Sequence, residues 1–186
     1  MFILYAVAIG ILIGYTRGGR LKCLTMHPLK KHELAIGGLI IQLLLFSGIP
    51  FFNTIPRIIS AGLHILSYIL LLLFILFNRK ITGIPVIGTG IFSNTLAITL
   101  NGGYMPTYVS NLESTSMEKY AESVAQGFNN SIAIADGTKL PWLCDIFHLP
   151  EWLPFSNVFS IGDVIIAAGV IIYLIINMQP TKKQSS

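Results

Sequence analysis

Hydrophobic residues along the chain gather in five long runs that shorter polar segments separate. The runs cover residues 2–16, 34–52, 58–77, 81–100 and 158–178. Runs of about 18 or more apolar residues are typical of helices that cross a bilayer. The pattern therefore predicts an all-α membrane protein with about five transmembrane helices, built as a single integral membrane domain over residues 1–186.

The first run differs from a secretory signal peptide in its flanking charges. No basic residue precedes it, and Arg17-Gly18-Gly19-Arg20 follows it. A signal peptide has the opposite charge order and a small-residue cleavage site. We therefore expect the first run to be retained as a helix whose N-terminus lies outside the cell.

Basic residues are distributed unequally between the segments that connect the runs. Nine of the 12 lysines and arginines lie in segment 17–33, in segment 78–80 and in the tail after residue 178. Two further lysines and Arg57 lie on the other side of the membrane. Because cytoplasmic loops carry an excess of Lys and Arg, the predicted topology is N-out and C-in, that of a multi-pass protein of the cell membrane.

Composition supports the same class. The chain is 53% hydrophobic and 11% charged, and its mean hydropathy is +0.72. A soluble domain normally has about a quarter charged residues. The net charge of +4 comes from basic residues in the segments that connect the apolar runs, a distribution that reflects membrane topology and not a nucleic-acid surface. We therefore expect membrane lipids as partners and no nucleic acid. Cys23 and Cys144 lie on opposite sides in this topology, which excludes a disulfide between them.

The fourth run carries small and polar residues at regular spacing. Gly83, Gly90 and Ala97 recur every seven residues and therefore share a helix face, which favours close helix packing in lipid. Asn94 and Asn101 share another face two turns apart, and both are candidate supporting polar residues. We expect this helix to lie inside the bundle.

The longest polar segment, residues 101–157, is predicted to lie outside the cell. Thr115 and Glu118 fit a capping box, and apolar residues recur after them at helical spacing, so a short amphipathic helix is expected there. The stretch 140–159 is rich in Trp, Phe and Pro, a composition that is typical of chain lying along a membrane surface.

Asp163 is the acid placed where the fifth run begins. An ionised aspartate at mid-bilayer costs roughly 2.5–3.5 kcal/mol, so such a residue normally faces the bundle and has a partner. In one interpretation it is a structural acid that bonds to Asn94 or to the backbone. In another it pairs with Asp145, since two close carboxylates cannot both ionise readily. The ionised one would take a proton from water while the protonated one polarises a carbonyl. Their spacing of eighteen residues permits this meeting but does not enforce it.

The stretch 145–170 resembles the C-terminal part of signal peptidase II, the lipoprotein signal peptidase. Asp145-Ile146-Phe147 is similar to that family's Val-Val-Asp-Phe-like motif, and 159–163 is similar to its Phe-Asn-x-Ala-Asp motif. Ser160 stands where the family has Asn, and Gly162 where it has Ala. The resemblance implies that Asp145 and Asp163 form a catalytic dyad, that a membrane-anchored peptide or lipopeptide is the substrate, and that no cofactor is needed.

The whole chain also resembles a group of small bacterial polytopic membrane proteins of unassigned function. That group combines Asn-Gly-Gly-Tyr-Met-Pro, here at 101–106, with Phe-Ser-Ile-Gly-Asp-Val, here at 159–164. This likeness implies no activity.

Three functions stay open at this point. The first is an intramembrane aspartyl hydrolase working at the outer face, and the second is a non-enzymatic membrane binding module. The third is a small carrier that uses Asp163 as a proton or cation site, for which the sequence lacks inverted repeats. His64 within the third run is interpreted as a polar contact in the bundle, and no nucleotide or metal motif is present in the sequence.

Overall fold

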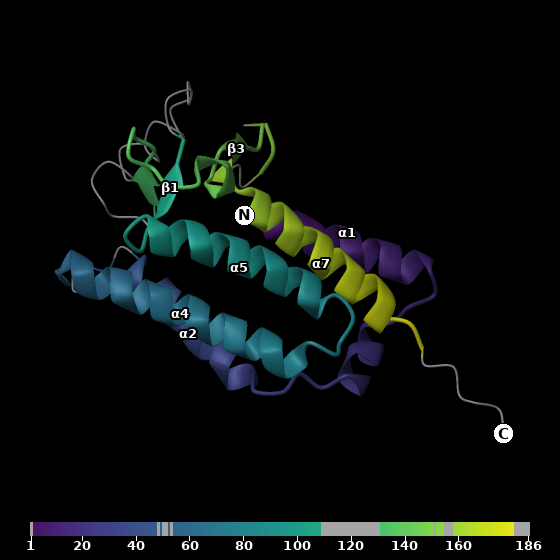
Figure 1. The fold of residues 1–186 in the computed structure, drawn as a ribbon. Coiled ribbons are helices and arrows are strands. Elements are labelled where there is room, and N and C mark those ends of the chain that lie inside the picture. The colour runs from purple at the N-terminus through teal and green to yellow at the C-terminus, as the bar shows by residue number, and fades with distance from the viewer. Residues whose placement is uncertain are drawn as a thin grey trace.

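The computed structural model describes residues 2–47, 49, 52, 54–108, 131–150, 152–154 and 158–180. The described chain is mostly helical, with a few short strands near one end of the helices (Figure 1). In chain order the elements are α1 (Phe2–Thr16), η1 (Leu21–Met26), α2 (His32–Leu45), α4 (Arg57–Asn78), α5 (Ile84–Leu100), β1 (Met105–Thr107), β2 (Ser131–Ala133), η2 (Pro141–Leu143), β3 (Phe147–His148), β4 (Val158–Phe159) and α7 (Ile161–Asn177).

Each predicted apolar run contains an α-helix within its described residues, but several helix ends differ from the predicted ones. Helix α1 has the predicted bounds, and α4 exceeds them by one residue at each end. Helix α2 ends at Leu45 rather than at residue 52, just before Ser47, Gly48 and Pro50, which are residue types that favour turns. Helix α5 begins after Gly83, whose φ of +94° is incompatible with a helix.

Helix length bears on the membrane prediction. Helix α4, with 22 residues, is long and apolar enough to cross a membrane. The other apolar helices, α1, α2, α5 and α7, have 14–17 residues. An ideal α-helix rises about 1.5 Å per residue, so these four are shorter than the hydrocarbon thickness of a typical bilayer, about 30 Å.

The helices are arranged so that α7 lies between α1 and α5, and α4 lies between α5 and α2 (Figure 1). Helices α1 and α7 run parallel, because Gly10 approaches Leu174 and Gly14 approaches Met178. Asn78, at the end of α4, bonds to Lys30, just before α2, so α2 and α4 run antiparallel.

Small residues allow α5 and α7 to approach closely. A Cβ added to Gly169 of α7 would lie 2.6 Å from the Ile87 nitrogen, and one added to Gly90 of α5 would lie 2.8 Å from the Ile166 nitrogen. Ala97 is fully buried in a core that continues into the segment after α5. Gly90 and Ala97 of the predicted small-residue face are closely packed, whereas Gly83 lies just before α5 and not on the helix. Helix α5 lies inside the bundle as expected.

The two ends of the bundle differ in charge. The basic end carries seven of the basic residues, together with Glu33 as the one acid among the described residues there. These seven are Arg17, Arg20, Lys22, Lys30, Lys31, Arg79 and Lys80. Hydrogen bonds join Asn78 to Lys30, so segments 17–33 and 78–80 lie together as predicted.

The opposite end, called here the strand end, carries β1 to β4. Phe2 of α1 stacks on Phe159 of β4 at 4.4 Å between ring centroids, so the N-terminus of α1 lies at this end. Cys23 and Cys144 are both free and buried at different ends, which agrees with the absence of a disulfide between them. The predicted amphipathic helix around Thr115 and Glu118 lies outside the described residues.

Candidate functional site

The start of α7 is a capping box that contains Asp163. The Asp163 amide donates to Ser160 Oγ at 3.1 Å, and the Ser160 amide donates to Asp163 Oδ2 at 3.1 Å. Asp163 therefore lies in the first turn of α7, which begins at Ile161 rather than at residue 158, where the predicted run begins. The reason is that Val158 and Phe159 pair as a strand with Phe147 and His148, so the helix begins only after Ser160.

Asn94 of α5 completes the surroundings of Asp163. Its Nδ2 donates to Asp163 Oδ1 at 2.9 Å, and its Oδ1 accepts from Ser160 Oγ at 2.9 Å. A Cβ added to Gly162 would overlap the Asn94 amide, with 2.7 Å to its Cγ. Glycine at this position therefore allows Asn94 to reach the cap. The predicted bond between Asp163 and Asn94 is confirmed, and donors reach both oxygens of the Asp163 carboxylate.

The backbone on both sides of Asp145 is held in place by strand-like pairing. The Asp145 amide donates to the Pro106 carbonyl at 3.0 Å, and the Tyr108 amide donates to the Asp145 carbonyl at 2.9 Å. Two residues further on, Phe147 pairs with Phe159 in an antiparallel register. The strand pairing stops there, because α7 begins at Ile161 and carries Asp163 in its first turn. The pairing therefore places Asp145 near the start of α7, where the charge of Asp163 acts on it.

The Asp145 carboxyl is half-buried and electrostatically strained. Its Oδ1 is buried with no hydrogen-bond partner in the described part of the chain. The pKa of Asp145 is raised from 3.8 to about 7, first by burial and then by the charge of Asp163, while a bond from the Thr107 hydroxyl acts in the opposite direction. A partly buried carboxyl near a second negative charge favours its neutral form for this reason. Asp145 is consequently protonated at a higher pH than an ordinary aspartate.

Tyr68 of α4 is a third member of this group that sequence reasoning missed. Its side chain packs against the buried cluster that includes Leu143 and Cys144, the residues just before Asp145. The group therefore combines residues from α4, from the segment before β3 and from α7. No local motif marks Tyr68, and only the packing of α4 against α5 brings it near the carboxylates.

Asn101, the second predicted supporting residue, bonds elsewhere. Its Nδ2 donates to the carbonyls of Ala97 at 2.7 Å and Lys139 at 2.9 Å, and its Oδ1 accepts from the Lys139 amide at 2.8 Å. Asn101 thus attaches the beginning of the stretch 139–163 to α5, and Asn94 attaches its end. The two asparagines position the strand end from one helix face.

The stretch 101–106 forms a tight turn that returns the chain to the bundle. Gly103 has a φ of +88°, and a Cβ added there would lie 2.5 Å from the Ala61 Cβ. The Gly103 carbonyl accepts a bond from His64 Nδ1 at 2.7 Å, which confirms His64 as a buried polar contact. Among the described residues no cluster of His, Cys, Asp and Glu is arranged to hold a metal ion.

Two surface cavities, of about 530 and 460 Å³, lie at the basic end and between α4 and α5. Neither is lined by Asp145 or Asp163. The larger cavity lies at the basic end, whereas Asp145 and Asp163 lie at the strand end.

Comparison with known proteins places this architecture in a family. Residues 26–175 match a family described as a family of unknown function, DUF5317. The chain belongs to DUF5317. The region shared with DUF5317 includes Asn94, Asp145 and Asp163, so the site lies inside the part of the chain that matches the family.

A similar protein is found in Thermotoga maritima, where it is described as an uncharacterized protein. It is 26% identical over 114 residues, which cover 60% of this chain and 61% of that protein. The chain thus matches about three-fifths of this relative's length. No solved structure matches the chain significantly. The prediction of an uncharacterised family is confirmed by these matches, which carry no activity.

Proposed function

We propose that this DUF5317 protein is a multi-pass protein of the cell membrane, N-out and C-in, whose Asp145 and Asp163 hydrolyse a membrane-anchored peptide or lipopeptide at the outer face. The half-buried Asp145 carboxyl, whose pKa the charge of Asp163 raises, is the observation that supports this proposal. The likeness of 145–170 to signal peptidase II supplies the expected reaction.

Exposed apolar side chains support the membrane placement. Leu12 of α1 is 65% exposed, Leu43 of α2 is 70% exposed and Ile58 of α4 is 83% exposed. Large exposed apolar patches are rare on soluble monomers and mark contact with another apolar phase. The basic end then lies in the cytoplasm under the positive-inside rule, and the strand end faces outside. A bilayer adapts to the shorter helices by local thinning.

The chemistry requires the two carboxyls to act in different protonation states. Asp163, held by Asn94 and Ser160, serves as the ionised base. A carboxylate has about four lone-pair positions, so two accepted bonds leave room for a water molecule. The oxygen of this water attacks the peptide carbonyl carbon, and Asp163 takes a proton from the water. Protonated Asp145 donates to the carbonyl oxygen, which becomes the hydroxyl of a tetrahedral intermediate.

Collapse of this intermediate reverses the proton movements. The C–N bond breaks, the proton held by Asp163 passes to the leaving nitrogen, and Asp145 regains its proton as the new carboxyl forms. The environments of the two residues support this division of roles, because burial favours neutral Asp145 whereas backbone and amide donors stabilise charge on Asp163.

The test compares the wild-type chain with Asp145→Asn and Asp163→Asn variants in bacterial cells. Mass spectrometry of the membrane fraction measures the N-terminal and C-terminal ends of membrane-anchored peptides. We expect ends that appear with the wild-type chain and are absent with either variant. Asp136→Asn, which changes an exposed acid of the same segment, is the matched control and keeps the wild-type ends. Identical ends in all four strains would refute the hydrolase.

A non-enzymatic membrane module is the second candidate, and the capping box favours it. Loss of a cap typically costs about 0.5–2 kcal/mol, so a purely structural Asp163 also explains the bonds to Ser160 and Asn94. In that case Asp163→Asn lowers the unfolding temperature, but neither Asp163→Asn nor Asp145→Asn changes the peptide ends. The two variants together therefore separate the candidates.

A further inference from the structure

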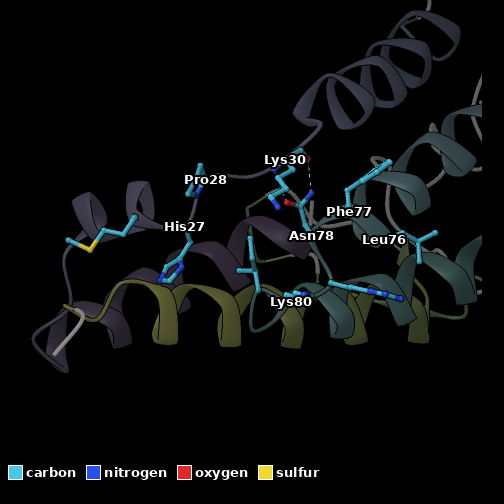
Figure 2. Close-up of a pocket in the computed structure, with 10 residues that line it drawn as sticks. His27, Pro28, Lys30, Leu76, Phe77, Asn78 and Lys80 are labelled. Carbon is cyan, nitrogen blue, oxygen red and sulfur yellow. Dashed lines mark hydrogen bonds between the residues drawn. The ribbon is translucent and has the colours of Figure 1, made fainter. Parts of the chain in front are cut away.

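The larger cavity, of about 530 Å³, lies at the basic end, far from the two carboxyls. Figure 2 shows that its lining comes from two segments, the chain between η1 and α2 and the last turn of α4 with the residues after it. The exposed basic side chains of Lys30, Arg79 and Lys80 line it, together with His27. No acidic residue is among the lining residues. The cavity is therefore suited to an anion.

The cavity is framed by a buried side chain. Asn78, which is 2% exposed, accepts from the Lys30 amide at 2.8 Å and donates to the Lys30 carbonyl at 2.7 Å. It also donates to the Phe74 carbonyl at 2.8 Å. These bonds hold the loop that bears Lys30 against the end of α4. The separation of the basic residues is thereby fixed by the fold.

An apolar groove of about 460 Å³ adjoins this cavity. It runs between α4 and α5, and Leu76 and Arg79 line both spaces. Its other lining includes Leu72, Gly88 and Phe92. The groove extends over residues 85–92 of α5, which is about 10 Å of helix. Leu76 and Phe92 are 58% and 53% exposed, so the groove opens to the outside of the bundle.

We propose that the cavity and groove together form a binding site for one anionic phospholipid, with its phosphate among Lys30, Arg79 and Lys80 and an acyl chain between α4 and α5. A basic cavity continuous with an apolar groove matches an amphiphile with an anionic head. Basic pockets between helices on the cytoplasmic side are suited to anionic headgroups. The inference rests on the membrane placement in the proposed function, and it does not depend on the hydrolysis.

Charge and shape together favour a lipid over a free anion. Inorganic phosphate or glycerol phosphate would use only the basic cavity and leave the groove without an occupant. A zwitterionic lipid would fill the groove but adds a positive choline group to a site that already has three cations. An anionic lipid satisfies both parts of the site.

The experiment uses the full chain purified in a mild neutral detergent, with native mass spectrometry to measure lipid retention. The probes are dioleoyl phosphatidylglycerol, dioleoyl phosphatidylcholine and glycerol 1-phosphate. We expect phosphatidylglycerol to bind as a single tight equivalent and the other two at least about ten-fold more weakly. Each removed basic residue is expected to lower phosphatidylglycerol affinity about five-fold.

Two pairs of variants separate the site from general effects. Lys30→Gln with Lys80→Gln removes two lining charges, and Arg17→Gln with Lys22→Gln removes two charges of the same end that do not line the cavity. Thr89→Trp fills the groove, and Leu96→Trp places the same ring two turns away on the same helix face. The first variant of each pair is expected to lose phosphatidylglycerol, while the second retains it.

The outcomes are distinct. Equal losses within a pair, or equal binding of the two lipids, would overturn the site. Glycerol 1-phosphate binding as tightly as phosphatidylglycerol would show a free-anion site and overturn the lipid assignment. Membrane integration is first measured by alkaline extraction. A chain that is extracted contradicts the proposed function, whereas an integrated chain without headgroup selectivity contradicts this inference alone.

Discussion

Replacement of Asp145 by asparagine should stabilise the protein at neutral pH. The Asp145 carboxyl has a raised pKa in the folded chain, about 7 instead of 3.8, because it is buried and lies near Asp163. The folded chain therefore binds more protons than the unfolded chain between these two pH values. Stability from this group is complete below pH 3.8 and is lost as the pH rises through about 7. Asparagine has the same shape and does not titrate.

The magnitude follows from the gap between the two pKa values. Each pKa unit corresponds to about 1.4 kcal/mol, so the ionised carboxyl destabilises the folded chain by at most about 4 kcal/mol. Local relaxation and partial exposure of Asp145 reduce this limit, and we expect about 1–3 kcal/mol. Asp145→Asn should thus exceed the wild-type stability by this amount at pH 8, with a much smaller difference near pH 4.

The assay is thermal unfolding in detergent micelles at a fixed scan rate, from pH 4 to pH 8. The wild-type unfolding temperature should fall across this range, and that of Asp145→Asn should fall less. Asp136→Asn, on an exposed residue, should keep the wild-type slope. Asp163→Asn should flatten the slope in part, because it removes the charge beside Asp145. A wild-type slope retained in Asp145→Asn would refute the assignment of the strained carboxyl.

Two further changes test the packing and the topology. Gly162→Ala should lower the stability by about 1–3 kcal/mol, because the added Cβ would overlap the Asn94 amide. The control is Gly62→Ala on α4, which should be tolerated because its Cβ would meet no atom within 4 Å. Equal unfolding temperatures for the two variants would contradict the close packing of α5 on α7. The topology is tested by cysteine labelling in a chain whose own cysteines are removed by Cys23→Ala and Cys144→Ala. A membrane-impermeant maleimide should label Asp136→Cys on intact cells and Lys80→Cys only after permeabilisation. The reverse pattern would contradict the N-out, C-in topology.

The two short motifs noted in the sequence have structural roles that support the site. Residues 101–106 return the chain onto the bundle through Gly103 and supply the Pro106 carbonyl that holds Asp145. Residues 159–164 start α7 through Ser160 and place Asp163 beside Asn94. Each motif therefore positions one of the two carboxyls. Their presence is explained by geometry with or without catalysis.

The two ends of the bundle also differ in the charged side chains that they carry. The strand end brings acids together, and the basic end combines three cations with an apolar groove. The proposed hydrolysis and the proposed lipid site lie on opposite sides of the membrane in the predicted topology. Each can therefore be disrupted by variants that leave the other intact.

The sequence by itself determined the five helices and the grouping of their connecting segments. Hydrophobic runs are local patterns, so α1 and α4 lie within one residue of their predicted bounds. The small-residue face of α5 and the bond from Asn94 to Asp163 were also predictable, because helical spacing defines a face and a buried acid needs a partner. Ser160 and Asp163 even carry a capping-box pattern that marks the true start of α7.

Only the tertiary structure decided how Asp145 is held at the start of α7 and which basic residues line one cavity. Asp145 is held by Pro106, and its neighbour Phe147 is held by Phe159, so contacts far apart in sequence fix its place. Tyr68 joins the acids only through helix packing. The basic cavity likewise requires Asn78 to hold the loop at Lys30, 48 residues earlier. Periodicity and composition describe each helix alone, whereas these sites arise where separate segments touch, and no local pattern specifies such contacts.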